Sequence, residues 1–419
     1  MNFIGDKDKD KDKDNKLIGQ GIYGCVYKPG IDCYAKYNNH NQLVTKIQIQ
    51  NFSSHNEISI SKHIINNIKQ WYKFFSLVIK NCPINFTSLY YNTHKHNIAL
   101  EKCNVLEKYK KKYNEKYNYF NLIQNNNPNN NKLILTYYKF INGLTFKKYF
   151  INLSNNLNVN TISYKQYLNI FILYLKRSLY SINLLSQYKI IHNDLHHNNI
   201  MIKYYKNYSK PIIIDFGEAF ILNNDYLKIY NNYLNYNNYD VTRYWDSYHK
   251  RFLTYITKFN HFQKYYNNNN INNINNFITQ EIVHKFVDDI IYNDLLYYNK
   301  YLTLLNEKQA QNLRQNLTQY FLQYSDFTNY KKIHNVISHL IQSMLYTLDN
   351  YSITINFLEI YIDNFIIIQK NNILFLKIQP YILLLIENLS YGLNNNHLSE
   401  SNYYKLIQNL QDLQHLQDL

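Results

Sequence analysis

Cysteine is scarce, and the four cysteines present follow no recognisable pattern. Cys25, Cys33, Cys82 and Cys103 have no C-x-x-C spacing, and a chain of 419 residues is not a small secreted domain held together by disulfides. The spacing therefore argues against a zinc module and against a redox site. We expect reduced thiols, as in a cytosol-like compartment.

Long apolar runs are missing as well. The N-terminal residues lack the apolar core of a signal peptide, and the most apolar later stretch, 371–386, is interrupted by Lys377 and Pro380. We therefore expect a soluble intracellular protein without membrane insertion.

Glycine, proline and methionine are rare, with 8, 5 and 3 residues against 46 tyrosines. Tyr, Asn, Lys and Ile are encoded by AT-rich codons, so we interpret this bias first as a property of the genome. The net charge of +16 favours acidic partners, but the lysines are scattered along the chain. Nucleic acid is therefore not expected as the main ligand. If it were one, binding would fall steeply with salt.

The central stretch 190–202 places a polar loop between two short apolar runs. The loop holds Asp194 and Asn199, and Asp215 follows the next apolar run. Carboxylate and amide oxygens are ligands that Mg²⁺ prefers, and a carboxylate can also accept the proton of an attacking hydroxyl. Asp and Asn are also common turn residues. The apolar runs on both sides favour a site for metal and phosphate over a simple turn.

A glycine-rich turn lies near the N-terminus, between two expected strands within 17–28. Gly19, Gly21 and Gly24 allow the backbone to approach phosphate groups without clashes from a Cβ atom. Dinucleotide-binding turns have the same glycine spacing. Here Val26 and Tyr27 continue as a strand rather than opening a helix, which argues against a Rossmann unit.

Together these motifs resemble the G-x-G-x-x-G-x-V, H-R-D-L-x-x-x-N and D-F-G motifs of protein kinases, over roughly residues 18–255. The strings G-x-Y-G-C-V-Y-K-P and I-H-N-D-L-H-x-x-N-I are most similar to the serine/threonine protein kinases of large nucleocytoplasmic DNA viruses. The resemblance implies an α+β bilobal fold, with a small mostly-β N-lobe, a large mostly-α C-lobe and extra C-terminal helices. A viral protein of this kind would act in the host cytoplasm or the virion.

The length is compatible with two or three domains, or with one two-lobed unit carrying additions. We expect a disordered charged tail at 1–15 and an N-lobe at 16–141, with an Asn/Lys-rich insertion around 104–131. The C-lobe core is expected at 142–276. A helical region at 277–419 either completes that lobe or forms an accessory module, and its role stays open.

The resemblance also implies roles for single residues. Asp194 is the expected proton acceptor, and His192 is expected to orient the same loop. Lys46 would contact the ATP phosphates and pair with Glu57. The separation of 11 residues between Lys46 and Glu57 is short for the family. An alternative is that Ser54 and Glu57 form a capping box at a helix N-terminus.

ATP and Mg²⁺ are the implied cofactors, and proteins are the implied substrates. Asn199 and Asp215 are the expected metal ligands. Tyr138 occupies the gatekeeper position, and the backbone of 139–141 is expected to face adenine. The residues expected around ATP are Ile18, Gly19, Gln20, Gly21, Ile22, Tyr23, Gly24, Cys25, Val26, Lys46, Lys139 and Ile141.

Two further elements are expected in the large lobe. Apolar residues recur every three or four positions between Ser163 and Gln187, which predicts a long amphipathic helix leading to the catalytic loop. Asp246, within Y-W-D-S-Y, is expected to brace that loop. The three histidines at 192, 196 and 197 suggest zinc, but no Cys or Glu stands at ligand spacing, so this alternative is disfavoured.

The chain departs from the family pattern at several points. Asn193 replaces the Arg of H-R-D, His196 replaces a Lys common in Ser/Thr kinases, and no A-P-E follows Asp215. H-x-D-L-H-x-x-N-I with I-D-F-G-E-A also resembles aminoglycoside and choline kinases, although those usually lack the glycine-rich loop. A non-catalytic pseudokinase scaffold is a further alternative, which the intact Lys46 and Asp194 disfavour.

Overall fold

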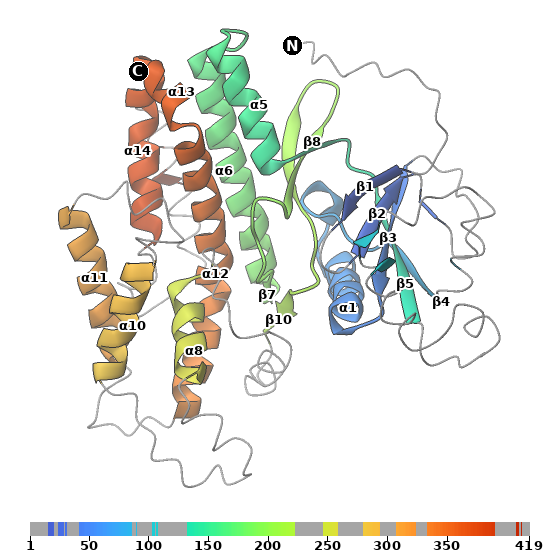
Figure 1. Cartoon of the computed structure of the whole chain (residues 1–419), viewed down its shortest axis with the longest axis horizontal. Helices are drawn as coiled ribbons and strands as arrows, with labels where there is room; N and C mark the ends of the chain where they lie inside the picture. Colours follow the sequence, from blue (N-terminus) through green and yellow to red (C-terminus); the bar gives the residue numbers. More distant parts are fainter. Residues whose placement is uncertain are drawn as a thin grey trace. The chain divides into compact units, whose positions relative to one another are not determined.

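The computed structural model describes residues 16–20, 24–28, 30–31, 42–85, 89, 103–104, 106–107, 132–222, 246–258, 280–293, 307–323, 333–389, 408–409 and 412. The chain divides into two compact units. The first unit is Met1–Gly143 with Lys203–Ala219, and the second is Leu144–Ile202 with Phe220–Leu419. An antiparallel sheet near the N-terminus and a mostly helical C-terminal part make the fold α+β, as the sequence predicted (Figure 1). The expected tail at 1–15 and most of the expected insertion lie outside the described residues.

The first unit is built on a five-stranded antiparallel sheet with the order β1-β2-β3-β5-β4. β5 is central and buries every side chain from Leu133 to Tyr138, because both of its faces are covered. In the register of the sheet, Lys46 lies opposite Thr136 on β5 and Val26 on β2. The strands are β1 (Lys16–Gln20), β2 (Gly24–Lys28), β3 (Leu43–Ile49), β4 (Lys80–Asn85) and β5 (Lys132–Lys139).

Helix α1 (Phe52–Asn67) and the short helix η1 (Trp71–Lys73) also belong to this unit. Asn51 is the N-cap of α1, and its side chain accepts the backbone N–H of Ser54 at 2.9 Å. The Ser54 hydroxyl in turn accepts the N–H of Asn51, which completes a capping box. Ser54 is therefore the third residue of the helix and not its cap, so the alternative capping role of Glu57 is wrong.

A disulfide joins Cys25 on β2 to Cys103, 78 residues later. Both cysteines are fully buried in a core cluster with Tyr27, Ile47 and Leu135. The prediction of reduced thiols is wrong for this pair and also for Cys82, which is disulfide-bonded too. Spacing along the chain could not reveal the bridge, because the contact depends on how distant segments meet in the fold.

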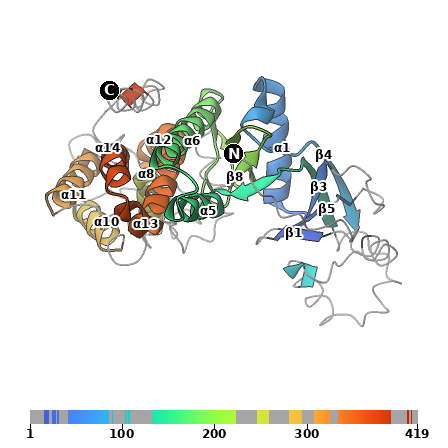
Figure 2. The ribbon, with the colours of Figure 1, turned by 90° about the horizontal axis from the view of Figure 1, so that it is seen from above.

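The second unit is a helical assembly around α12 (Ile333–Asp363), which contacts α6, α8 and α14 (Figure 1, Figure 2). Nearly every residue of α12 from Leu348 to Tyr361 is buried, as expected for a helix surrounded by others. The other helices are α5 (Phe146–Asn158), α6 (Tyr164–Gln187), α8 (Tyr248–Lys258), α10 (Gln280–Asn293), α11 (Glu307–Leu322), α13 (Phe365–Lys370) and α14 (Asn372–Leu389).

The long helix predicted between Ser163 and Gln187 is confirmed as α6. Ser163 is its N-cap and forms a capping box with Gln166, whose side chain accepts the N–H of Ser163 at 2.9 Å. The α6 face that the sequence pattern identified is buried, and Phe171 packs edge-on against Phe357 of α12 at 5.1 Å between ring centroids.

Short strands flank the loop that carries Asp194 and the segment that carries Asp215. They are β6 (Gly143–Thr145), β7 (Ile190–Ile191), β8 (Ile200–Tyr204), β9 (Ser209–Ile213) and β10 (Phe220–Ile221). β7 pairs with β10, and β6, β8 and β9 form a three-stranded sheet in the order β6-β8-β9. Among the described residues, none of the helices has the length and apolar character needed to cross a membrane.

Candidate active site

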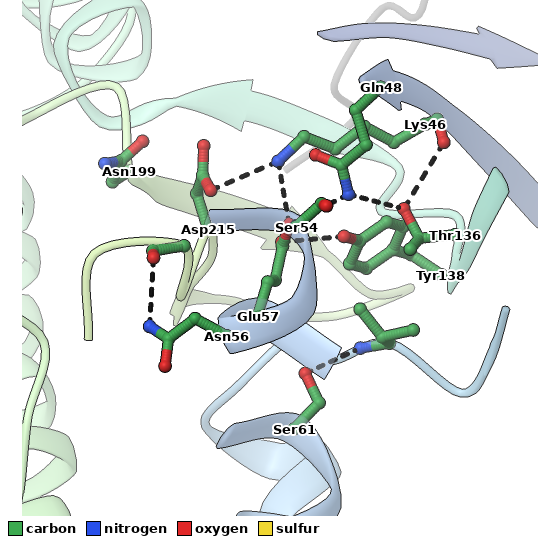
Figure 3. Close-up of polar contacts among 12 residues, drawn as sticks. Lys46, Gln48, Ser54, Asn56, Glu57, Ser61, Thr136, Tyr138, Asn199 and Asp215 are labelled. Atoms are coloured by element: carbon green, nitrogen blue, oxygen red, sulfur yellow. Dashed lines mark hydrogen bonds and ion pairs between the residues drawn. The ribbon is translucent and has the colours of Figure 1, made fainter. Parts of the chain in front are cut away.

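In the first unit, Lys46 lies between two carboxylates (Figure 3). Its Nζ donates to Oε2 of Glu57 at 3.0 Å and to Oδ1 of Asp215 at 3.2 Å. The predicted ion pair with Glu57 is therefore present. Burial alone lowers the pKa of Lys46, but the charges of Glu57 and Asp215 outweigh burial and raise it. Lys46 is thus held as a cation at a fixed position.

Glu57 is itself held by neutral donors. The Tyr138 hydroxyl donates to Oε1 at 2.6 Å, and Gln48 Nε2 lies 3.4 Å from Oε2 and also contacts the hydroxyl of Thr136 (Figure 3). Burial and the Glu57 charge both raise the pKa of Tyr138, so its hydroxyl stays protonated and remains a donor. The sequence placed Tyr138 near the nucleotide, but it did not predict that this side chain fixes Glu57.

The segment after β9 is anchored to α1. Asn56, the residue before Glu57, donates from Nδ2 to the carbonyl of Gly217 at 3.0 Å and to that of Ala219 at 2.6 Å. Phe216 is buried and packs edge-on against Phe75 at 5.8 Å. One helix therefore holds both the partner of Lys46 and the backbone that follows Asp215. Sequence reasoning missed Asn56, since an Asn within a helix gives no signal of a partner so far along the chain.

Asp215 adopts a backbone φ of 63°, in the left-handed region that Asp tolerates better than most residues. The side chain of Asp215 is 38% exposed, whereas that of Glu57 is 3% exposed. The two partners of Lys46 therefore differ: Glu57 is enclosed, and Asp215 is accessible to a ligand. A carboxylate of this kind suits a hard cation such as Mg²⁺.

The residues expected around the nucleotide phosphates lie on β1 and β2, where the structure describes them. Ile18, Gly19 and Gln20 belong to β1, and Gly24, Cys25 and Val26 belong to β2, whereas 21–23 lie outside the described residues. A Cβ atom on Gly24 would lie 2.6 Å from the carbonyl oxygen of Ile47. Gly24 is therefore required for the close approach of β2 to β3, whatever its part in phosphate binding.

The expected hinge begins at the exposed end of β5. Lys139 is exposed, Ile141 is half-buried, and the Phe140 N–H between them donates to the carbonyl of Gln42 at 2.7 Å. That bond fixes the start of the segment proposed to face adenine.

In the second unit, Asn199 organises the loop that carries Asp194. Its Nδ2 donates to the backbone carbonyl of Asp194 at 2.7 Å and lies 3.3 Å from Oδ2 of the same residue. His196 Nε2 lies 3.9 Å from that oxygen. Because the Asn199 nitrogen is used in this way, its amide oxygen is the atom that could serve a metal ion.

The buried carboxylate of Asp349, on α12, is hydrogen-bonded to the same loop. Its carboxylate accepts the backbone N–H of His192 at 2.7 Å and that of Asn193 at 3.1 Å, and all three residues are buried. Burial raises the pKa of Asp349, and His192 with the two N–H donors opposes part of that rise. Asn193 has a φ of 65°, a conformation in which Asn is among the tolerated residues.

Two more side chains contact this loop. Asn356, two helical turns after Asp349 on α12, donates from Nδ2 to the carbonyl of Leu195 at 3.0 Å. Lys250 Nζ lies 3.4 Å from the carbonyl of Asn193 and 2.6 Å from Asp246. Asp246, the aspartate expected to brace the loop, is thus linked to it through Lys250, whereas Asp349, which the sequence did not suggest, accepts two of the loop's N–H groups directly.

The sequence of α12 contains a signal that could have identified Asp349 and Asn356, namely polar residues within an otherwise apolar stretch of helix. The buried hydroxyls of α12 mostly donate to the carbonyl one turn back, as Thr347 does to Ser343 and Thr354 to Asn350. An Asp cannot donate in this way when ionised, and buried polar groups need partners. A buried Asp in an otherwise apolar helix therefore indicates a contact outside the helix.

No protein-family model matches this chain, and no curated protein matches it either.

Proposed function

We propose that the protein is an ATP-dependent protein kinase that transfers the γ-phosphoryl group to Ser or Thr hydroxyls of proteins. The observation that carries this proposal is the position of Lys46, held between the enclosed carboxylate of Glu57 and the accessible carboxylate of Asp215. Such a fixed cation is what neutralisation of ATP phosphates requires, because phosphoryl transfer depends mainly on positioning and charge stabilisation.

The second unit supplies the complementary chemistry in this proposal. Asp194 accepts the proton of the attacking hydroxyl, and Asn199 fixes the Asp194 backbone and side chain. His192 and Asn193 hold the loop through their bonds to Asp349. The side-chain oxygens of Asn199 and Asp215 would hold Mg²⁺, which supplies charge neutralisation at the transferred group.

The deciding experiment measures transfer of labelled phosphate from ATP in the presence of Mg²⁺. Wild type and Asp194→Asn are compared, with Asp288→Asn as the matched control because Asp288 is an exposed aspartate on α10. We expect transfer to protein Ser/Thr to fall by at least about 100-fold in Asp194→Asn and to be unchanged in the control. Equal transfer by both variants would overturn the proposed role of Asp194.

The acceptor panel separates the alternatives. Generic proteins, choline and aminoglycosides are offered in parallel reactions. Label on small alcohols alone would assign the protein to the small-molecule phosphotransferases. ATP binding without transfer to any acceptor would favour a pseudokinase scaffold. In the binding arm, Lys46→Met should weaken ATP affinity, whereas Lys62→Met, which alters an exposed lysine on α1, should not.

A further inference from the structure

Two lysines of the first unit point to the same face of its five-stranded sheet. In the register of the sheet, Val26 lies opposite Lys46. Lys28 follows Val26 by two residues on β2, and side chains alternate along a strand, so Lys28 shares this face with Lys46. Val44 and Tyr138, which lie opposite each other on β3 and β5, belong to it as well. The other face of the sheet packs in the core that contains the disulfide.

Beside Lys46, this face is apolar. A cluster of buried and partly buried side chains covers it, namely Val26, Val44, Ile58, Val78, Tyr138 and Phe140. In the function proposed above, Lys46 receives the phosphates of ATP, so the flat apolar purine of the same molecule would lie against this cluster. Phe140 is the middle residue of the segment 139–141 that is expected to face adenine.

Phe140 is held at two points. Its backbone N–H donates to the carbonyl of Gln42 at 2.7 Å, and the Nζ atom of Lys28 lies over its ring, 3.5 Å from the centroid. On the same sheet, Lys80 is 5.8 Å from the ring centroid of Tyr137. The attraction between a cation and the quadrupole of an aromatic ring grows as the cation approaches and as water is excluded, and both Lys28 and Phe140 are half-buried. The contact at Phe140 is therefore the stronger of the two.

A fixed ring also fixes the backbone that carries it. A rotation of the peptide groups at 139–141 would draw the Phe140 ring away from Lys28 and lose this contact. The two lysines of this face thus have different surroundings. Lys46 lies between the carboxylates of Glu57 and Asp215, whereas Lys28 lies over an aromatic ring at the end of β5.

We propose, on the basis of the proposed function, that Lys28 is a positioning residue for the nucleobase of ATP. Its ammonium group holds the Phe140 ring, and the ring holds the backbone of 139–141 in the orientation that receives the purine. Lys28 contacts neither the phosphates nor the transferred group. Its contribution therefore depends on the base, whereas that of Lys46 depends on the phosphates.

The test is isothermal titration calorimetry of the full chain with Mg²⁺ and either ATP or inorganic tripolyphosphate, which has no base. Lys28→Met should weaken ATP binding by about three- to tenfold and leave tripolyphosphate binding unchanged. Lys28→Arg should bind ATP as wild type does, because a guanidinium group also stacks on an aromatic ring. Lys80→Met is the matched control, since Lys80 is an exposed lysine beside a ring on another strand of the sheet, and it should bind both ligands normally.

Phe140→Leu keeps an apolar side chain but removes the ring. It should weaken ATP binding to a similar extent, and adding Lys28→Met to it should have no further effect, because the two residues act through one contact. An additive loss in the double variant would overturn the proposal. Equal weakening of ATP and tripolyphosphate by Lys28→Met would also overturn it, since Lys28 would then be a phosphate ligand.

Lys46→Met separates this inference from the proposed function. It should weaken the binding of ATP and of tripolyphosphate alike. If it does so while Lys28→Met binds ATP as wild type does, the positioning role of Lys28 is wrong and the proposed function stands. If Lys46→Met binds both ligands as wild type does, the proposed function fails at its phosphate site, and the role of Lys28 fails with it.

Discussion

The carboxylate of Asp349 accepts the backbone N–H of His192 at 2.7 Å, although 157 residues separate the two in sequence. The loop that carries Asp194 therefore depends on a helix from the C-terminal third of the chain. That helix is part of the same core as α6, so this stretch of the C-terminal region contributes directly to the candidate site.

Asp349→Ala should destabilise the second unit. Two buried N–H groups would lose their acceptor, and we expect the free energy of unfolding to fall by at least about 2 kcal/mol. Urea denaturation followed by circular dichroism measures the change. Asp363→Ala is the control on the same helix, because Asp363 forms a partly exposed ion pair with Lys147 and should cost about 1 kcal/mol or less. Equal losses for both variants would contradict the bracing role.

Local signals predicted one part of this structure well. The capping residue Ser163 and the apolar spacing that follows it specify α6 without tertiary information. The pairing of Lys46 with Glu57 was implied by the resemblance to protein kinases, and it joins a strand to the next helix along the chain. Such features are encoded within one element or two neighbouring ones.

Local sequence signals could not predict the contacts between residues far apart in the chain. The disulfide of Cys25 with Cys103 and the bonds of Asn56 to Gly217 join residues whose separation in sequence carries no information about distance. The sequence suggested Asp246 as the bracing residue and gave no sign of Asp349, which packing around α12 brings to the loop. Where several acidic residues are available, only the packing of the helices decides which one is used.

Tyr138→Phe should lower the free energy of unfolding of the first unit and remove one hydrogen bond from the Glu57 carboxylate. The change removes the donor that lies 2.6 Å from Glu57 Oε1 in a buried site, and we expect a loss of about 1 to 3 kcal/mol. Tyr72→Phe is the control, because the Tyr72 side chain is 52% exposed and its hydroxyl has access to water. Thermal unfolding of the two variants side by side gives the comparison, and an unchanged melting temperature for Tyr138→Phe would show that Glu57 needs no such donor.

Gly24→Ala should destabilise the protein through a steric clash between β2 and β3. The added Cβ would lie 2.6 Å from a backbone oxygen of β3, which cannot rotate away, so we expect a cost of about 1 to 3 kcal/mol. Gly19→Ala adds the same methyl group on β1, where the nearest heavy atom is 4.0 Å away, and should be nearly neutral. Urea midpoints distinguish the two. A neutral Gly24→Ala would mean that β2 and β3 can separate without loss.

Breaking the disulfide should destabilise the first unit substantially. Closing a loop of this length reduces the entropy of the unfolded chain, which corresponds to about 4 kcal/mol in the loop-closure description. Cys25→Ser/Cys103→Ser should therefore melt at a lower temperature than wild type under oxidising conditions. In dithiothreitol, which also reduces the disulfide of Cys82, wild type and variant should melt at the same temperature. If the variant and wild type melt together in the oxidised state, the bridge does not contribute to stability.

His249 should make the stability of the second unit sensitive to mild acid. Burial, with a smaller effect of His339, lowers the pKa of His249 to about 3 from an ordinary value of 6.5, and its Nε2 lies 2.9 Å from the Tyr320 hydroxyl. The unfolded chain therefore binds a proton below pH 6.5 that the folded state refuses until about pH 3. Stability from this residue is complete above pH 6.5 and falls as pH decreases, by about 1.4 kcal/mol per unit.

The measurement compares wild type with His249→Gln, which keeps a side chain able to bond Tyr320 but does not titrate. Between pH 7.5 and 5.5, wild type should lose about 1.4 kcal/mol more than the variant in urea denaturation, because only the interval below the ordinary pKa contributes. Carboxylates elsewhere titrate in both proteins and cancel in the difference. If the stability of both proteins falls equally with pH, His249 has the same pKa in the folded and the unfolded chain. Its burial between α8 and α11 would then not disfavour the protonated form.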